Sequence, residues 1–111
     1  MNPSAEDAWL DALPLSQDDK KAIRHYTRQR RLHQIPAKRN KLQPVLRWIA
    51  LAFAADVEYS EPQVNAILKQ YHDDHTRLRR ELVDCGFLRR ERSGAKYWLT
   101  PADEAAGPVA G

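Results

Sequence analysis

A run of helix and turn signals between residues 56 and 100 constrains the fold of this chain more than any other feature of its sequence. A short extended piece at 56–59 leads into Ser60, and Gln63 stands three positions later, which is the spacing of a helix capping box. These signals predict a helix that starts at Ser60 and ends at the polar cluster 72–74. Its core-facing residues at helical spacing are Val64, Ile67, Leu68 and Tyr71.

Another helix follows almost at once, because Asp73 or Asp74 can cap it. Gly86 can adopt the left-handed conformation that commonly ends a helix. Two short runs, 87–92 and 96–100, are joined by a Ser-Gly-Ala tip and have the pattern of a β-hairpin. The inward-facing residues of this helix are Leu78, Leu82 and Cys85.

Two earlier helices are predicted in the first half of the chain. Ser16 and Asp19 have capping-box spacing, and we expect a helix from Gln17 to about Leu32. An Ile-Pro pair then breaks the helical pattern, because proline disfavours helix in the residue before it. The next helix is expected from about Lys41, with Pro44 in its first turn. Its buried stripe consists of Leu42, Val45, Leu46, Ile49 and Phe53.

The predicted order is helix, short strand, helix, tight turn at 71–74, helix and hairpin. We therefore predict a mainly α fold with a small β-hairpin, in which an additional N-terminal helix precedes a winged helix-turn-helix. A chain of 111 residues can form one small core. We expect an acidic, partly disordered arm at 1–15, a winged-helix domain at 16–100 and a disordered tail at 101–111.

Charge is strongly polarised along the chain. The window from Lys20 to Ala55 contains ten lysines and arginines and no aspartate or glutamate, whereas residues 1–19 contain five acids and no base. The net charge of +3 hides this separation. Positive potential without interspersed acids attracts polyanions, and the alternative is that several of these side chains only solvate exposed helix faces.

The basic window and the hairpin supply the candidate binding residues. We expect phosphate contacts from Arg28, Arg30, Arg31, Lys38, Arg39, Lys41, Arg90, Arg92 and Lys96. If the helix after residue 74 is a recognition helix, the first candidates for base contact are Thr76, Arg79 and Arg80. The counterweight is that Arg77 can pair with Glu81, and Arg80 with Asp84, at helical spacing.

Several other classes of protein are not expected. Cys85 falls on an inward helix face, where thiols are usually inert, and His72 and His75 lack the spacing of a zinc site, so we predict no enzyme, no metal and no cofactor. No stretch approaches the roughly 18 apolar residues of a membrane span. One cysteine cannot form an internal disulfide and no secretion leader is recognisable, so we expect a cytoplasmic protein.

The sequence also resembles a known family. The motifs that carry the resemblance are LHQIPAKRNK at 32–41, VLRW at 45–48, YSE at 59–61, VN at 64–65 and HDDHTRLRRELVD at 72–84, followed by Gly86-Phe87-Leu88 and Tyr97-Trp98. They are similar to the bacterial domain of unknown function, family 2087, over about residues 30–99. The resemblance implies a protein that occurs alone or attached to helix-turn-helix modules in transcriptional regulators. It implies no catalytic or binding residues.

These observations favour a nucleic-acid-binding winged-helix protein, a bacterial DNA-binding factor that regulates transcription, with DNA favoured over RNA as the partner. One alternative is a protein-interaction module or homodimer that docks through Trp48 and Leu51. Another is a protein that binds structured RNA or ribosomes through the same basic window. The sequence does not distinguish the target site, an effector or the oligomeric state.

Overall fold

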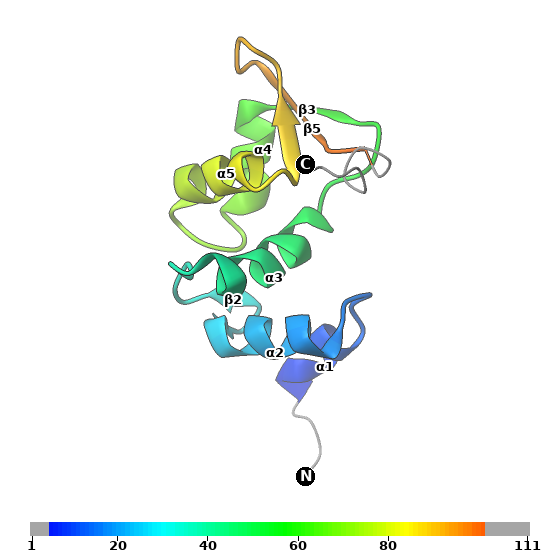
Figure 1. Cartoon of the computed structure of the whole chain (residues 1–111), viewed down its shortest axis with the longest axis vertical. Helices are drawn as coiled ribbons and strands as arrows, with labels where there is room; N and C mark the ends of the chain where they lie inside the picture. The colour runs from blue at the N-terminus through cyan, green and yellow to red at the C-terminus, as the bar shows by residue number, and fades with distance from the viewer. Residues whose placement is uncertain (1–4, 102–111) are drawn as a thin grey trace.

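The computed structural model describes residues 5–101, which fold into helices and small antiparallel sheets (Figure 1). Within this range the first half contains two helices, a two-stranded hairpin and a longer helix. The second half contains a strand, two helices and a second hairpin. The elements are α1 (Ala5–Asp11), α2 (Gln17–Tyr26), β1 (Thr27–Arg28), β2 (Arg31–Leu32), α3 (Arg39–Ala50), β3 (Glu58–Ser60), α4 (Glu61–Leu68), α5 (His75–Asp84), β4 (Leu88–Arg90) and β5 (Lys96–Leu99).

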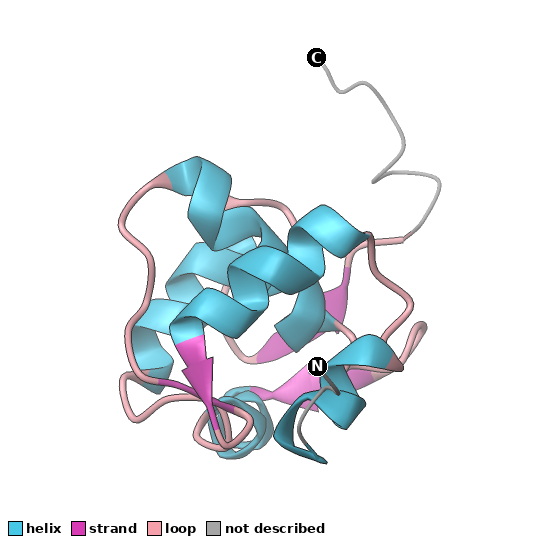
Figure 2. Cartoon of the chain, turned by 90° about the horizontal axis from the view of Figure 1, so that it is seen from below, coloured by secondary structure: helices cyan, strands magenta, loops and turns pink. Residues whose placement is uncertain are grey.

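The strands form two separate sheets. In the three-stranded sheet the order is β3-β5-β4, with all pairs antiparallel, Tyr59 opposite Tyr97 and Leu88 opposite Leu99. In the other sheet β1 pairs only with β2. Helices make up most of the molecule in Figure 2, with the strands toward the lower part of that view. This mixture of helices and small antiparallel sheets is compatible with the predicted winged helix.

The longest helix, α3, lies at the centre of the core. Its residues Val45, Leu46 and Ile49 are fully buried. The helix packs against α2 on one side and contacts α5 on the other. Trp48 lies between Trp9 of α1, with ring centroids 5.3 Å apart, and Tyr71 of the α4–α5 turn, at 4.8 Å. The core therefore joins the N-terminal helices to the second half of the chain.

The predicted helix ends are confirmed at three caps and one glycine. Ser16 accepts a hydrogen bond from the Asp19 amide, and Ser60 and Gln63 form the complete capping box. Asp74 caps α5 through the Arg77 amide. Gly86 has φ +86°, the left-handed conformation expected after α5. Short polar side chains therefore set these boundaries locally, as the sequence predicted.

The predicted helix from Gln17 to about Leu32 is wrong in its second half. α2 ends at Tyr26, and the next residues form the β1–β2 hairpin, with Arg28 opposite Arg31. Gln29 and Arg30 make its two-residue turn with φ of 55° and 67°. Long side chains rarely adopt such angles, so the local sequence carried no turn signal. Tertiary contacts override helix propensity here, because Leu32 is buried and its amide donates to the Tyr71 carbonyl at 2.8 Å.

Two further boundaries differ from the prediction. α3 begins at Arg39 rather than about Lys41, which places Pro44 in its second turn instead of its first. Pro44 is buried, so its packing offsets the hydrogen bond that it cannot donate. α4 ends at Leu68, earlier than the predicted polar cluster, and Tyr71 lies in the α4–α5 turn with its ring against Trp48.

The described part of the predicted N-terminal arm includes α1, which packs on the core. α1 buries Leu10 completely, and its Trp9 ring packs on Trp48. Residues 1–4 and 102–111 lie outside the described residues, so the predicted disorder of the tail stays a prediction.

The strained turn of the β1–β2 hairpin yields a stability prediction. Arg30→Gly and Gln29→Gly each remove a side chain from a left-handed residue, where glycine carries no steric penalty. Each substitution should raise the free energy of unfolding by about 0.5–1 kcal/mol, since the relief exceeds the entropy lost by glycine. Urea unfolding followed by tryptophan fluorescence measures this. A lower midpoint for both variants would show that the turn is not strained.

Candidate functional site

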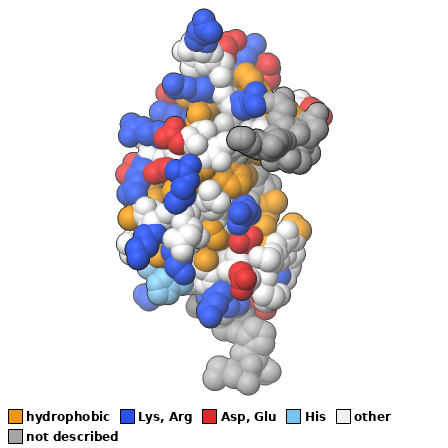
Figure 3. All heavy atoms as spheres, viewed as in Figure 1, with side chains coloured by type: hydrophobic (Ala, Val, Ile, Leu, Met, Phe, Trp, Pro, Cys, Tyr) orange, Lys and Arg blue, Asp and Glu red, His pale blue; other side chains and the backbone are white. Residues whose placement is uncertain are grey.

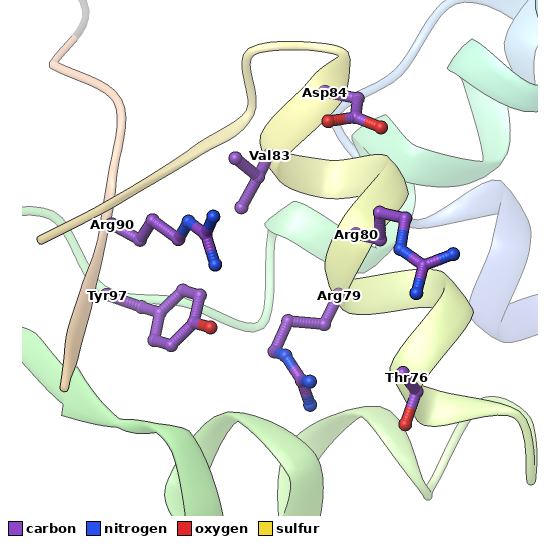
Figure 4. A pocket seen from close by; sticks show the side chains of 7 residues that line it. All are labelled: Thr76, Arg79, Arg80, Val83, Asp84, Arg90 and Tyr97. Atoms are coloured by element: carbon purple, nitrogen blue, oxygen red, sulfur yellow. The ribbon is translucent and has the colours of Figure 1, made fainter. Parts of the chain in front are cut away.

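An open groove of about 360 Å³ lies between α5 and the β4–β5 hairpin (Figure 4). In that view Arg79, Val83, Arg90 and Tyr97 point toward one another across the groove, whereas Arg80 projects from the other side of α5. The helix and the hairpin thus bring together side chains from distant parts of the sequence. The lining residues are Thr76, Arg79, Arg80, Val83 and Asp84 of α5, with Arg90 and Tyr97 of the hairpin.

Buried side chains of β5 and α5 support the groove. Tyr97 of β5 is 2% exposed and its hydroxyl donates to the Glu61 carboxylate of α4 at 3.4 Å. Leu78 and Leu82 anchor the opposite face of α5 in the core. Because α5 buries these two residues four positions apart, Thr76 and Arg80 lie on its exposed side, whereas Val83 is partly buried against the core.

Arg79 does not present a free guanidinium for base contact. Its side chain is only 17% exposed, donates a hydrogen bond to the Asn65 side chain and lies 3.9 Å from the Glu61 carboxylate. Both partners belong to α4. Arg79 therefore ties α4 and α5 together, and its predicted base contact stays a prediction. Sequence spacing could not reveal this link, because Asn65 is fourteen residues away.

Thr76 and Arg80 are exposed on α5. Of the two ion pairs predicted on this helix, Arg77 and Glu81 form theirs at 4.0 Å. Arg80 and Asp84 line the same groove without making an ion pair within 4.0 Å in the described part of the chain. The guanidinium of Arg80 therefore remains available to an external anion.

The start of α5 is acidic, and an arginine from the first hairpin offsets part of that charge. Arg31 donates to the Asp73 carboxylate at 2.9 Å and to the Lys69 carbonyl at 2.7 Å. Asp74 is used as the helix cap. Arg31 of β2 thus holds the α4–α5 turn, while its side chain stays partly exposed and its predicted phosphate contact stays a prediction.

Three other cations of the acid-free window also bind the chain itself. Lys20 is buried and its ammonium donates to the Asp11 carbonyl at 2.8 Å. Arg24 lies 3.6 Å from the Asp11 carboxylate, and Arg47 pairs with Asp19 at 2.9 Å. Asp11 and Asp19, which precede the window in sequence, therefore neutralise part of its positive charge in the folded chain. All three cations lay outside the predicted phosphate contacts.

Most of the predicted phosphate-contacting side chains are exposed. The following members of this set are exposed and make no ion pair within 4.0 Å among residues 5–101: Arg28, Arg30, Lys38, Arg39, Lys41, Arg90 and Arg92. Lys96 differs, since it lies 3.4 Å from Glu58 on the neighbouring strand. Figure 3 shows Lys and Arg side chains from the hairpin down the side of the molecule that carries α5, with acids interspersed. The molecule thus keeps an exposed set of cations.

Three of those cations surround the start of α3. Lys38 is the N-cap residue and makes no side-chain capping hydrogen bond, and the first turn contains no acid. Arg39 and Lys41 follow in that turn. Cations at a helix N-terminus oppose the helix dipole, so this arrangement costs free energy unless an anion offsets it.

A second open groove, with a volume of about 710 Å³, runs along α2 and reaches Lys41. Its charged lining includes Lys21, Arg24 and Asp18. His25 and Tyr26 also line it, with their rings edge to face at 4.8 Å. This groove extends the basic character of α3 toward the N-terminal helices.

Cys85 and His72 were considered as a nucleophile and as a metal ligand, and both side chains interact with other parts of the chain. Burial raises the pKa of the Cys85 thiol, Glu81 and Asp84 raise it further, and Arg39 opposes them. A protonated thiol is a poor nucleophile. His72 accepts from the Asp74 amide at 2.9 Å and helps to shape the turn before α5. Across residues 5–101 no three His, Cys, Asp or Glu side chains gather as metal ligands.

Trp48 and Leu51, the two residues considered for binding a protein partner, differ in their exposure to solvent. Trp48 is 5% exposed and packed between two aromatic rings, so this side chain belongs to the core. Leu51 is 48% exposed. The two residues therefore do not form one exposed apolar face.

Within the described range, no helix has the length and apolar character needed to cross a bilayer.

Comparison with known proteins places the chain in a family. A family model described as "Uncharacterized protein conserved in bacteria (DUF2087)" matches residues 31–99, from β2 through β5. The chain belongs to the DUF2087 family. The predicted resemblance is thereby confirmed. The DUF2087 match includes Lys38, α5 and the hairpin but leaves out α1, α2 and β1. No curated protein and no solved structure matches this chain.

The structural role of Arg79 can be tested by comparing two adjacent arginines. Arg79→Ala leaves Asn65 without its partner and should lower the free energy of unfolding by about 1–2 kcal/mol. Arg80→Ala removes the same charge from an exposed position and should change it by less than about 0.5 kcal/mol. Urea unfolding monitored by circular dichroism measures both. Equal stabilities would contradict the α4–α5 link.

Proposed function

We propose that this chain is a winged helix-turn-helix protein that binds duplex DNA and regulates transcription in the bacterial cytoplasm. In this proposal α3, α4 and α5 form the three-helix unit, α5 is the recognition helix, and the β4–β5 hairpin is the wing. The chain would act without a cofactor or a catalytic step.

The order of elements supports the fold assignment. A strand precedes α4, a short turn joins α4 to α5, and a hairpin follows α5 and pairs with the strand. Arg79, Asn65 and Glu61 hold α4 and α5 in one orientation. A recognition helix needs such support, because base contacts depend on its fixed placement in the major groove.

The observation that carries the proposal is the groove between α5 and the hairpin. It is lined by exposed Thr76 and Arg80 of the helix, with Arg80 projecting from the side of α5 away from the hairpin (Figure 4), and by Arg90 of the hairpin; neither arginine has an ion pair within 4.0 Å among the described residues. Arginine and threonine can contact base edges, and a hairpin that carries arginines can follow the phosphate backbone. We assign base contact to Thr76 and Arg80 and phosphate contact to Arg90 and Arg92.

The cations near α3 provide the sequence-independent part of binding. Lys38, Arg39 and Lys41 stand at a helix start without an acid, where a phosphate would satisfy both the side chains and the helix dipole. Counterions released from contacted phosphates make such binding strongly dependent on salt.

The direct experiment is fluorescence anisotropy of the purified protein with labelled duplex DNA, single-stranded DNA and RNA over a salt series. We expect tightest binding to duplex DNA. With about six phosphate contacts, affinity should fall by roughly 10³ between about 50 and 200 mM salt. Preference for RNA would redirect the proposal to an RNA-binding protein. Failure to bind any of the three at low salt would refute it.

The groove itself is tested by substitution of its exposed arginines, with losses of affinity compared per charge removed. Arg80→Ala and Arg90→Ala together should weaken duplex binding by at least about tenfold, because both remove an exposed guanidinium from the proposed contact surface. The control is Arg77→Ala, which removes one positive charge from α5 at a position paired with Glu81. We expect the control to weaken binding by less than about twofold. Similar losses per charge in all variants would place the contact elsewhere.

A further inference from the structure

The β1–β2 hairpin carries a cluster of arginines in a strained turn. Gln29 and Arg30 both have positive φ, in a turn that usually selects asparagine and glycine. Arg28 lies directly opposite Arg31 across the two strands, and like charges in that position repel. Folding alone therefore gives no reason for arginines at 28 and 30. Both side chains are exposed and make no ion pair within 4.0 Å among residues 5–101.

This hairpin is fixed against the turn that leads into α5. The Leu32 amide donates to the Tyr71 carbonyl at 2.8 Å, and Arg31 donates to the Lys69 carbonyl at 2.7 Å and to Asp73 at 2.9 Å. The His33 amide closes the base of the hairpin by donating to the Tyr26 carbonyl at 3.0 Å. A two-residue turn on such an anchor has little freedom, so the position of Arg30 relative to α5 is set by the fold.

The two hairpins lie on either side of α5. Along the long axis of the molecule in Figure 1, the β4–β5 hairpin stands above α5 and the β2 strand lies below it. The first hairpin contacts the start of α5 through the turn residues, and the second follows the end of α5 through Gly86 and Leu88. The start of a recognition helix enters the major groove, so a hairpin beside it faces the flanking backbone.

We infer that the β1–β2 hairpin is a second DNA-contacting hairpin, in which Arg28 and Arg30 bind backbone phosphates on the side of α5 opposite the wing. This inference rests on the proposed function. It also explains how the acidic start of α5 can approach DNA. Arg31 neutralises Asp73, and Arg28 and Arg30 of the same hairpin supply exposed positive charge. The family match begins at residue 31, so both phosphate-binding arginines lie outside the shared region.

The strained turn offers variants that separate charge from folding. Arg30→Gly removes the charge and relieves a left-handed residue, so it should remain folded. Gln29→Gly relieves the neighbouring residue of the same turn without changing the charge. Lys21→Ala removes one exposed cation from the same basic window, on α2 and outside the residues of the hairpin. The three variants together distinguish a local contact from general electrostatic attraction.

The experiment measures binding of the full-length protein to a labelled duplex of about 30 base pairs, long enough to reach beyond one helical turn on both sides. Arg30→Gly should weaken binding by about five- to tenfold and lower the salt slope by about one. Gln29→Gly and Lys21→Ala should each change affinity by less than about twofold. Arg28→Gln should resemble Arg30→Gly.

Three outcomes overturn the inference. If Arg30→Gly binds like wild type while the Arg80 and Arg90 substitutions weaken binding, the second hairpin makes no contact and the proposed function stands. If Lys21→Ala costs as much as Arg30→Gly, net charge alone explains the loss. If wild-type protein binds no nucleic acid, the proposed function fails and this inference fails with it.

Discussion

Burial of α3 between the N-terminal helices and the second half of the chain is the constraint on which the structure depends. Its residues Val45, Leu46 and Ile49 have no exposed surface. Trp48 contacts rings from both directions, Trp9 on one side and Tyr71 on the other. Tyr71 lies in the turn before α5, and its carbonyl accepts a hydrogen bond from the Leu32 amide. The position of α5 is therefore tied to the same core. Residues as far apart as 9 and 71 are thus held by one helix.

The fold divides the cations of the basic window by the contacts that they make within the chain. Lys20, Arg24, Arg31 and Arg47 bind acids or carbonyls of the chain and stabilise its tertiary structure. The remaining cations, near α3, at the first hairpin and along α2, are exposed and make no ion pair within 4.0 Å among residues 5–101. A charge count cannot make this distinction, because the neutralising acids Asp11, Asp19 and Asp73 stand outside the window in sequence. The set of window cations without such a contact in the described part of the chain is therefore smaller than the charge count suggests.

Local signals predicted much of the second half of the fold. The capping box at Ser60, the cap at Asp74 and the left-handed Gly86 depend on neighbours three or four residues away, and each is found in the structure. The β1–β2 hairpin could not be predicted in this way, because its turn contains Gln29 and Arg30 and its anchor is a distant turn. The contacts of Arg79 could not be predicted for the same reason, since its partners lie on another helix.

The family match and the folding unit have different boundaries. The match begins at residue 31, yet α2 covers one side of α3 and α1 supplies Leu10 and Trp9 to the same core. A fragment cut at residue 31 would expose buried leucine, isoleucine and tryptophan side chains of α3 to water. Such a fragment would aggregate or require another polypeptide to shield it. Any relative that shares only the matched region must cover this helix in some other way, so the segment before the match is where family members can differ in assembly.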